Sequence, residues 1–441
     1  MDFKQSLTYL YSLGHEVLAA KFGLENIRCL LDALGRPERA FKSVIIAGTN
    51  GKGSTAAMLE SVLRLAGHRT ALYTSPHMVR LEERICVAGN EISETDFARQ
   101  VGQVRTVAEA LVHSGRLPAL PTFFEQLTAI ALNYFCERKV ELAVLEIGVG
   151  GQEDAVNVVN PIATVITAID YDHQNLLGNT ITEITSVKAG VIKPATPVII
   201  GRQRHIAAME GLMRRCLEIK ALPVFANEPT NVSLRDDGQV AFDYDSSHNE
   251  YTRIVPGLKG RHQAENAAAV IEACELLTEL GVVIAREAIV KGLRRVNWPG
   301  RLELVDGRPC LLLDGAHNRA GARCLRAYLD EFWNKGVVLI FGTMSDKDIA
   351  GMAAELFSAA KTIFLTRLPD PRAATPEALS RLMLSPKLNL IAAESVQQAL
   401  SWARRVTPPD GLICATGSLQ LIGEVKRLIE TEKDSVETEN Q

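Results

Sequence analysis

Short runs of aliphatic, often β-branched residues with almost no charge recur along the chain and indicate its fold class. Four of these runs stand at residues 43–47, 142–147, 163–169 and 197–200. Because they are apolar on both faces, they are typical of central strands in a parallel sheet that helices cover on both sides. Amphipathic stretches between them, such as 55–66 and 123–137, supply those helices. The pattern predicts a doubly wound α/β domain.

The alternation of strands and helices stops near Pro299 and Gly300 and then starts again. Further strands are predicted at 310–314, 336–342, 362–366 and 411–417. We therefore expect a P-loop α/β domain with a mainly parallel sheet at 1–297 and a smaller, Rossmann-like α/β domain at 298–441. Near 223–256 polar and apolar residues alternate around the turn-forming pair Asp237-Gly238, which predicts a small antiparallel appendage to the first domain.

Composition narrows the class of partner. The 48 basic and 52 acidic residues give a net charge of −4, which offers no bulk attraction to nucleic acid or to an anionic membrane, so small-molecule substrates are expected. The eight cysteines are scattered and form no CxxC pair, and no apolar run reaches the length of about 18 residues that a membrane span needs. These features predict a cytoplasmic protein.

The stretch "VIIAGTNGKGST", from Val44 to Thr55, carries a predicted strand into a glycine-rich loop and then a helix. A strict Walker pattern would need a glycine at Ile46 and would lack Gly53 between Lys52 and Ser54. The physical context still favours a phosphate site, because backbone N–H groups and the helix N-terminus point at an anion. Lys52 would neutralise the β- and γ-phosphates, and the hydroxyl of Ser54 or Thr55 would reach Mg²⁺. The alternative is a glycine-rich turn with a solvated lysine.

Polar side chains follow other predicted strands, where metal ligands for a nucleotide would lie. Glu146 ends the run 142–147, and His173 follows the run 163–169, with Asp170 and Asp172 as competing ligands near it. Ser75 lies after a third predicted strand, although a Ser-Pro pair there also suits a simple turn.

Two segments near these strand ends are open to two interpretations. The glycines of 148–157 permit close backbone approach to a substrate, which Asp154 could contact, or they form a flexible connection. Phe123 and Phe124 offer rings for a flat ligand, but Thr122 and Glu125 also form a capping box at a helix start.

In the second domain "LLLDGAHN" places Asp314 and His317 at a strand end, where they would face the cleft between the domains. Arg301, just after the predicted boundary, could reach a phosphate held by the first domain, or it could be a surface arginine. Without further information Lys188 would be a solvated helix lysine.

Taken together, the ordered segments resemble the folylpolyglutamate synthase and dihydrofolate synthase family, which is related to the Mur ligases. The matching segments, which run over nearly the whole chain, include "AGTNGKGST", "TSPHMVRLEERI", "EIGVGGQEDAVN", "DHQNLLGNT", "KAGVIK", "GRHQAENAAA", "WPGRLE", "DGAHN" and "GTMSDKD". The loop of this family is GTNGKGS or GTNGKGT, so Gly53 is its normal form.

The resemblance implies an ATP-dependent amide ligase that adds L-glutamate to dihydropteroate, to the glutamate tail of reduced folates, or to both. In such enzymes ATP phosphorylates a carboxylate, and the amine of glutamate then displaces the phosphate. Catalysis of this kind rests on positioning and charge neutralisation, so no nucleophilic triad is needed. Lys52, Lys188 and His317 are the expected catalytic residues.

The resemblance also assigns roles to single residues. ATP would contact Asn50, Gly51, Lys52, Gly53, Ser54, Asn266, Arg301 and Asp314. Magnesium would be held by Ser75, Glu146 and His173. Lys188 matches a lysine that is carbamylated in this family. The pterin would lie near Thr122, Phe123, Phe124 and Asp154, and the incoming glutamate near His317 and Ser418.

One departure concerns the segment after the double glycine. Many family members have Arg-Leu-Asp-Ala-Thr-Asn there, whereas this chain has Gln152 and Glu153 before Asp154. Losing a cation and gaining an acid would alter the affinity for an anionic pteroate. Two alternative functions stay open: a Mur-type ligase acting on another carboxylate, and a P-loop NTPase that works as a regulatory module. A monomer is expected in each case.

Overall fold

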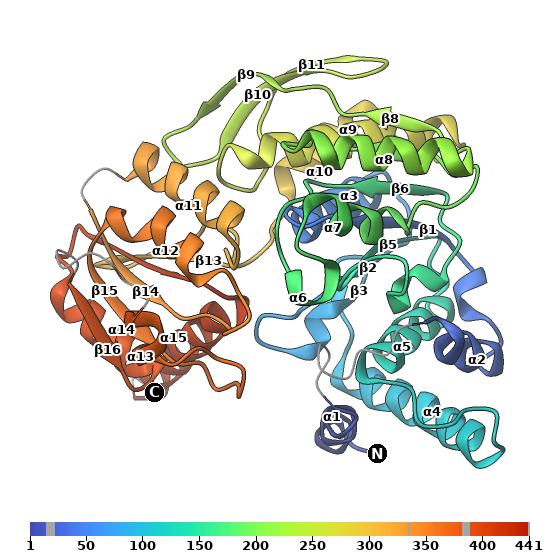
Figure 1. The fold of residues 1–441 in the computed structure, drawn as a ribbon, viewed down its shortest axis with the longest axis horizontal. Coiled ribbons are helices and arrows are strands. Elements are labelled where there is room, and N and C mark those ends of the chain that lie inside the picture. Colours follow the sequence, from blue (N-terminus) through green and yellow to red (C-terminus); the bar gives the residue numbers. More distant parts are fainter. Residues whose placement is uncertain (15–22, 334–335, 382–388, 440–441) are drawn as a thin grey trace.

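The computed structural model describes residues 1–14, 23–333, 336–381 and 389–439. Figure 1 shows two α/β halves side by side, with a small sheet above them. The larger sheet has the strand order β4-β3-β2-β5-β1-β6-β7-β8. Its strands are β1 (Lys42–Ala47), β2 (Thr70–Tyr73), β3 (Ile85–Val87), β4 (Asn90–Glu91), β5 (Leu142–Glu146), β6 (Ala163–Ile166), β7 (Val198–Ile200) and β8 (Pro223–Phe225). All neighbouring pairs from β2 to β8 are parallel, and the edge strands β3 and β4 are antiparallel.

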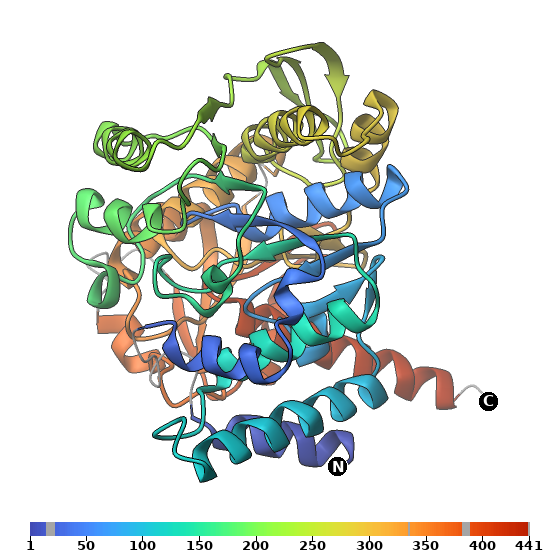
Figure 2. The ribbon, with the colours of Figure 1, turned by 90° about the vertical axis from the view of Figure 1, so that its right-hand side faces the viewer.

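Helices cover both faces of this sheet, as its apolar strands require. In β1, Ile45 and Ala47 pack into one core, and Val44 and Ile46 pack into the other. The first core is covered by α1 (Phe3–Ser12), α2 (Glu25–Ala33), α4 (Glu94–His113), α5 (Phe123–Glu137), α7 (Ile181–Ala189) and α8 (Ile206–Ile219). The second is covered by α3 (Lys52–Leu65), α9 (His262–Glu279) and α10 (Arg286–Arg295). The turned view in Figure 2 shows these two helical layers. The predicted doubly wound sheet is confirmed.

Two boundaries differ from the sequence prediction. Helix α3 begins at Lys52 rather than at Thr55, because Gly51 adopts a φ of 89° and turns the chain directly into the helix. The range 223–256 is not a single antiparallel unit, since β8 pairs in parallel with β7 as the edge of the large sheet. The small sheet consists of β9 (Thr230–Leu234), β10 (Val240–Asp245) and β11 (Glu250–Ile254).

The second half is built on a sheet with the order β12-β13-β17-β14-β15-β16. Its strands are β12 (Glu303–Val305), β13 (Cys310–Asp314), β14 (Val337–Phe341), β15 (Ala360–Thr366), β16 (Leu390–Ala393) and β17 (Leu412–Thr416). Only β12 is antiparallel to its neighbour. Helices α11 (Arg319–Phe332) and α12 (Ile349–Leu356) pack on one face, and α14 (Val396–Val406) and α15 (Leu419–Glu439) pack on the other. The remaining helices are α6 (Gln174–Leu177) and α13 (Pro376–Arg381), and short 3₁₀ turns are η1 (Pro37–Arg39), η2 (Leu81–Arg84), η3 (Ala155–Val158) and η4 (Phe357–Ala359).

The domain boundary at residue 297/298 remains a prediction. No helix within the described part of the chain is both long and apolar enough to cross a bilayer.

Candidate functional site

A cavity of about 520 Å³ lies between the two halves, a size that suits a nucleotide or a similar ligand. Its lining comes from the carboxyl ends of strands in both sheets, where ligands of open α/β sheets bind. Most of the predicted site residues line it: Asn50, Gly51, Lys52, Gly53, Ser54, Ser75, Phe123, Glu146, His173, Lys188, Arg301, Asp314, His317 and Ser418.

The loop between β1 and α3 forms one wall of the cavity and is fixed by contacts with α9. A side chain at Gly51 would place its Cβ 2.4 Å from Oδ1 of Asn266, so the backbone and the amide touch. Asn266 in turn donates a 2.9 Å hydrogen bond to Gln263, which lies 3.3 Å from the Ser54 hydroxyl. Asn266 therefore supports the loop, although it is outside the cavity lining itself.

Gly53 allows the chain segment that joins the two halves to pass close to the loop. A Cβ at Gly53 would lie 3.0 Å from Nε1 of Trp298 and 3.6 Å from Oε2 of Glu146. Gly53, which the Walker pattern lacks, is thus needed here because a larger residue would meet the Trp298 ring. Lys52 bends back over the loop and donates to the Thr49 carbonyl oxygen at 3.2 Å.

The three predicted magnesium ligands have the donor atoms and the surroundings of a hard-cation site. The Ser75 hydroxyl and Nδ1 of His173 are buried without a hydrogen-bond partner. Glu146 is buried and accepts a 3.2 Å hydrogen bond from the Ser75 amide. Burial raises the pKa of Glu146, against the charge of Lys52, and burial lowers the pKa of His173 to about 3. Buried polar atoms without partners need a ligand, so these residues fit Mg²⁺.

Three His, Cys, Asp or Glu side chains do not come together anywhere in the described chain as a self-sufficient metal cluster. Mg²⁺ usually binds one or two protein carboxylates, such as that of Glu146, and completes its shell with water and substrate phosphates. The site therefore suits a metal that arrives with a nucleotide.

Lys188 is buried in the floor of the cavity rather than solvated, which corrects the default interpretation of an isolated helix lysine. Its Nζ donates a 2.8 Å hydrogen bond to the carbonyl oxygen of Gly48. Burial, together with the nearby charge of Lys52, lowers the pKa of Lys188 to about 7. A substantial fraction of this amine is therefore uncharged near neutral pH.

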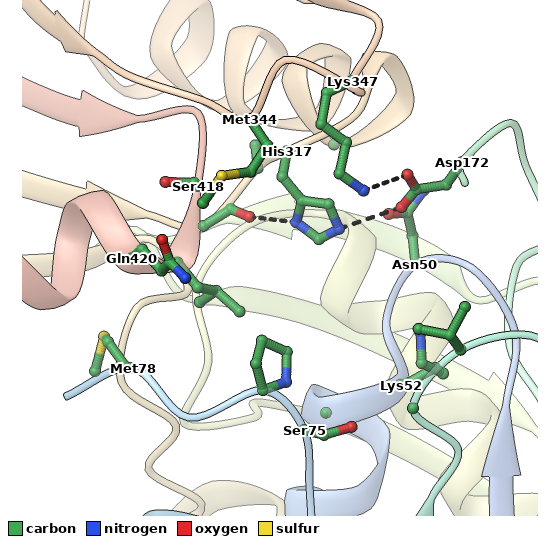
Figure 3. Close-up of a pocket in the computed structure, with 18 of the residues that line it drawn as sticks. Asn50, Lys52, Ser75, Met78, Asp172, His317, Met344, Lys347, Ser418 and Gln420 are labelled. Atoms are coloured by element: carbon green, nitrogen blue, oxygen red, sulfur yellow. Dashed lines mark hydrogen bonds and ion pairs between the residues drawn. The ribbon is translucent and has the colours of Figure 1, made fainter. Parts of the chain in front are cut away.

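Asp172 connects the two halves across the cavity (Figure 3). Its carboxylate lies 2.6 Å from Nζ of Lys347 and 3.3 Å from Nε2 of His317. The other ring nitrogen of His317 lies 2.9 Å from the Gly315 carbonyl oxygen, so only the doubly protonated ring donates to both. Although burial acts in the opposite direction, the hydrogen bond from His317 and the positive charges nearby hold the pKa of Asp172 well below its usual range.

Arg301 and Asp314 stand together where the second sheet faces the loop. Asp314 accepts hydrogen bonds of 3.0 Å from the backbone amides of Leu302 and Ala316. Burial raises the pKa of Asp314 and lowers that of Arg301, while each charge opposes the shift of the other. A cation and an anion placed in this way can hold a phosphate and a sugar hydroxyl.

The residues expected around a flat substrate divide into two groups. Phe123 lines the cavity and stacks on Tyr11, with ring centroids 5.9 Å apart. Thr122 forms the predicted capping box with Glu125, which confirms the local interpretation of that pair. Phe124 packs behind Gly148, and Asp154 accepts hydrogen bonds from the Val149 and Val156 amides. Thr122, Phe124 and Asp154 lie outside the cavity lining.

Several lining residues escaped the sequence prediction, among them Tyr11, Arg84 and Lys347. Arg84 is buried, donates to Nδ1 of His77 at 3.0 Å and lies over the Phe123 ring. Each stands alone in its segment, with no strand-end or loop pattern to indicate a role. The available signal was the family resemblance, since Arg84 lies in the quoted segment "TSPHMVRLEERI" and Lys347 in "GTMSDKD".

Comparisons with known proteins agree with this arrangement. Residues 46–274 match the Mur ligase middle domain, and residues 300–419 match the Mur ligase glutamate ligase domain. A dihydrofolate synthase/folylpolyglutamate synthase of Bacillus subtilis is 34% identical over 94% of this chain and 96% of its own length.

The chain belongs to the folylpolyglutamate synthase and dihydrofolate synthase family.

Solved structures of this family share the fold. Folylpolyglutamate synthase of Mycobacterium tuberculosis complexed with ADP superposes with a TM-score of 0.88, at 29% identity, over 97% of this chain and 99% of that one. An Escherichia coli structure in complex with DHPP and ADP gives a TM-score of 0.85 at 29% identity, over 98% and 99% of the two chains. The protein is thus an ATP-dependent ligase of the Mur ligase type.

Proposed function

We propose that the protein joins L-glutamate to dihydropteroate, to the glutamate tail of reduced folates, or to both, at the expense of ATP. The observation that carries this proposal is the cavity itself, which sets the nucleotide loop of the first half opposite polar groups of the second half, including His317 and Ser418. The relatives that match over nearly the whole chain are named for these two activities.

The reaction needs two successive steps at one carboxyl carbon. An acceptor carboxylate oxygen attacks the γ-phosphorus of ATP, which forms an acyl phosphate and releases ADP. The amine of glutamate then attacks the acyl carbon, and the tetrahedral intermediate expels phosphate as the nitrogen loses a proton. The protein contributes by holding the reactants and by balancing charge.

Nucleotide binding is assigned to residues of both halves. The loop Asn50, Gly51, Lys52, Gly53 and Ser54 would hold the triphosphate at the N-terminus of α3, with Lys52 opposite the β- and γ-oxygens. Asn266 would contact the nucleotide from α9. Arg301 and Asp314 would bring the second half onto ATP.

Ser75, Glu146 and His173 would hold Mg²⁺, as their buried, partly unpartnered donor atoms support. When bound, the metal would neutralise phosphate charge. Glu146 contributes a carboxylate, while Ser75 and His173 contribute neutral donors and keep the site from becoming too anionic for a triphosphate.

Lys188 would carry a carbamate, which turns the amine into a carboxylate close to the metal ligands. Carbamylation requires an uncharged amine, and a pKa of about 7 in a buried position makes that form available. The resulting anion would lie close to Lys52, whose charge acts on Lys188.

The acceptor would lie along Phe123, with Thr122, Phe124 and Asp154 shaping the loop and helix start around it. The incoming glutamate would lie near His317 and Ser418. The enzyme would work as a monomer. Eight free cysteines support a reducing compartment such as the cytoplasm.

The test is product analysis by mass spectrometry. Purified protein with Mg-ATP and L-glutamate is supplied with dihydropteroate in one reaction and with a tetrahydrofolate in another. A mass gain of one or more glutamate residues in either reaction supports the proposal, and gain in both supports two activities. ADP release that is indifferent to glutamate, with no change in acceptor mass, would refute the ligase assignment and favour a nucleotide hydrolase.

A further inference from the structure

The carboxylate of Asp172 receives polar contacts from the second half inside the cleft (Figure 3). It lies in the loop that follows β6 of the first sheet. Its partners belong to the second half: Lys347 at 2.6 Å, His317 at 3.3 Å and the Asn318 amide at 3.3 Å. These donors come from loops after two different strands, β13 and β14, so Asp172 holds the cleft-facing edge of the second sheet at two points.

The same contact reaches the nucleotide loop through Asn318. Its Nδ2 donates to Oδ1 of Asn50 at 2.9 Å as well as to Asp172, and its Oδ1 accepts from the Gly321 amide at 2.9 Å, where it caps α11. Both hydrogens of the Asn318 side-chain amide are used, and its oxygen also accepts a hydrogen bond, so the orientation of the amide is fixed. The position of α11 is thus linked to the position of Asn50 in the loop.

Other contacts between the halves are of a different kind. Arg261 pairs with Glu331 at 2.6 Å, but both side chains are largely exposed, and exposed pairs contribute little. At Gly238 a Cβ would lie 2.2 Å from the Tyr328 hydroxyl, and at Gly423 it would lie 2.0 Å from the Met78 carbonyl oxygen. These close approaches fix where the halves touch, but they offer no charged pair that opening the cleft would break.

Burial makes the Asp172 contact sensitive to closure. The side chains of Asp172 and Lys347 are only 6% and 10% exposed, so each charge depends on the other while the cleft is shut. Opening the cleft would separate them, while the hydrogen bond that Asp172 accepts from the backbone amide of His173, in its own half, would remain. A buried charge without its partner is strongly unfavourable. The pair therefore favours two arrangements, a closed cleft with both charges in contact and an open cleft with both charges in water.

We propose that Asp172 is the positioning residue that latches the cleft: its contacts with Lys347, His317 and Asn318 hold the second half closed over the nucleotide loop. The latch works on the relative position of the two halves and transfers no atom in the reaction. Its kinetic consequence rests on the proposed function, whereas its effect on closure does not.

The experiment measures the radius of gyration of the full-length, ligand-free protein by small-angle X-ray scattering. Wild type is compared with Asp172→Asn, with Lys347→Met and with the double variant. We expect each single variant to be larger than wild type and the double variant to open no further than Asp172→Asn, because the pair of Asp172 with Lys347 is already lost in that single variant. Glu331→Gln is the matched control, since it also removes one carboxylate from an ion pair between the halves and should remain as compact as wild type.

Lys347→Arg keeps the charge and should remain closed, which separates the loss of the ion pair from a general disturbance of the loop. Thermal unfolding of each variant establishes that it is folded. In turnover assays Asp172→Asn should raise the KM for glutamate about tenfold, as expected for loss of a charged hydrogen bond, with a smaller change in kcat.

Equal radii for wild type and Asp172→Asn would overturn the latch, and so would an open wild type in solution. Full additivity of the two single variants would show that Asp172 and Lys347 act separately and would also overturn it. Because scattering requires no turnover, a protein that fails to ligate glutamate would leave these outcomes unaffected.

Discussion

The Nζ of Lys188 donates a hydrogen bond of 2.8 Å to the carbonyl oxygen of Gly48, the residue that follows β1 and begins the loop before α3. The floor of the cavity is therefore joined to the loop by a lysine whose pKa has fallen to about 7. We expect Lys188→Ala to lose most activity and to regain part of it when acetate or formate is added, because a small carboxylate can take the place of a carbamate. Rates near wild type in the untreated variant would make Lys188 a structural residue only.

Lys52→Ala should lower turnover by about 10²–10³-fold, because it removes a positive charge that would balance the phosphates at the helix N-terminus. The check is steady-state ADP release with saturating acceptor and glutamate. Lys42→Ala is the matched control, since Lys42 begins β1, is exposed and lies outside the cavity. Near-normal rates in Lys52→Ala would contradict the phosphate assignment of the loop.

Glu146→Gln should raise the Mg²⁺ concentration needed for half-maximal activity by about 10–100-fold, because the carboxylate of the proposed metal site becomes neutral. Titration of activity with Mg²⁺ at fixed ATP measures this shift. Glu109→Gln, which alters an exposed carboxylate on α4, should leave the titration unchanged. An unchanged titration in Glu146→Gln would place the metal elsewhere.

Stability should fall as pH decreases from about 6.5 toward 4 because of His262. Burial, with the charges of Arg301 and Arg204 acting in the same direction, lowers the pKa of His262 from 6.5 to about 4. The folded state therefore binds this proton less well than the unfolded state, and the stability present above pH 6.5 is lost on acidification. The loss is at most about 3 kcal/mol.

Urea unfolding at several pH values tests this, with His262→Gln as the variant. His77 and His173 have pKa values lowered to about 3 and add to the slope, so the variant should show a shallower decline and not a flat one. An identical slope in wild type and His262→Gln would mean that this histidine is accessible to protons in the folded state.

Gly151→Ala should cost about 1–3 kcal/mol and reduce activity, because its Cβ would lie 2.6 Å from the Val187 carbonyl oxygen and 2.9 Å from Cα of Lys188, both backbone atoms. Gly102→Ala is the contrasting variant, since Gly102 lies within α4 and an added Cβ meets nothing within 4 Å. Alanine there should stabilise the protein by about 0.5–1 kcal/mol. Chemical denaturation of both variants measures the difference.

The fold was largely predictable from sequence because its strands are buried on both faces. A run such as 142–147 carries that information locally, and β5 is found there at Leu142–Glu146. The edge strand β8 was assigned to the wrong unit because Pro223 and Phe225 are only partly covered and give no such signal. Its pairing with β7 is set by tertiary contacts that a sequence pattern does not contain.

The cavity lining was predictable where residues end strands, as Glu146 and Asp314 do. Lys347 could not be found in this way, because a lysine in a polar loop has no pattern of its own. It reaches the cavity only because β14 lies beside β17 in the sheet, which brings its loop to face Asp172. Thr122 illustrates the opposite case, since its contact with Glu125 three residues away is a local feature that sequence alone predicts.

The contact between Gly53 and Trp298 has a consequence for engineering and for natural variation. The nucleotide loop and the segment joining the two halves share one van der Waals surface, although 245 positions separate them in the sequence. A chimaera that exchanges the second half at residue 297/298 would bring a foreign side chain against the loop and would have to keep tryptophan there. Recombination between relatives should therefore tolerate crossovers inside the small β9–β11 sheet better than crossovers at the apparent domain border.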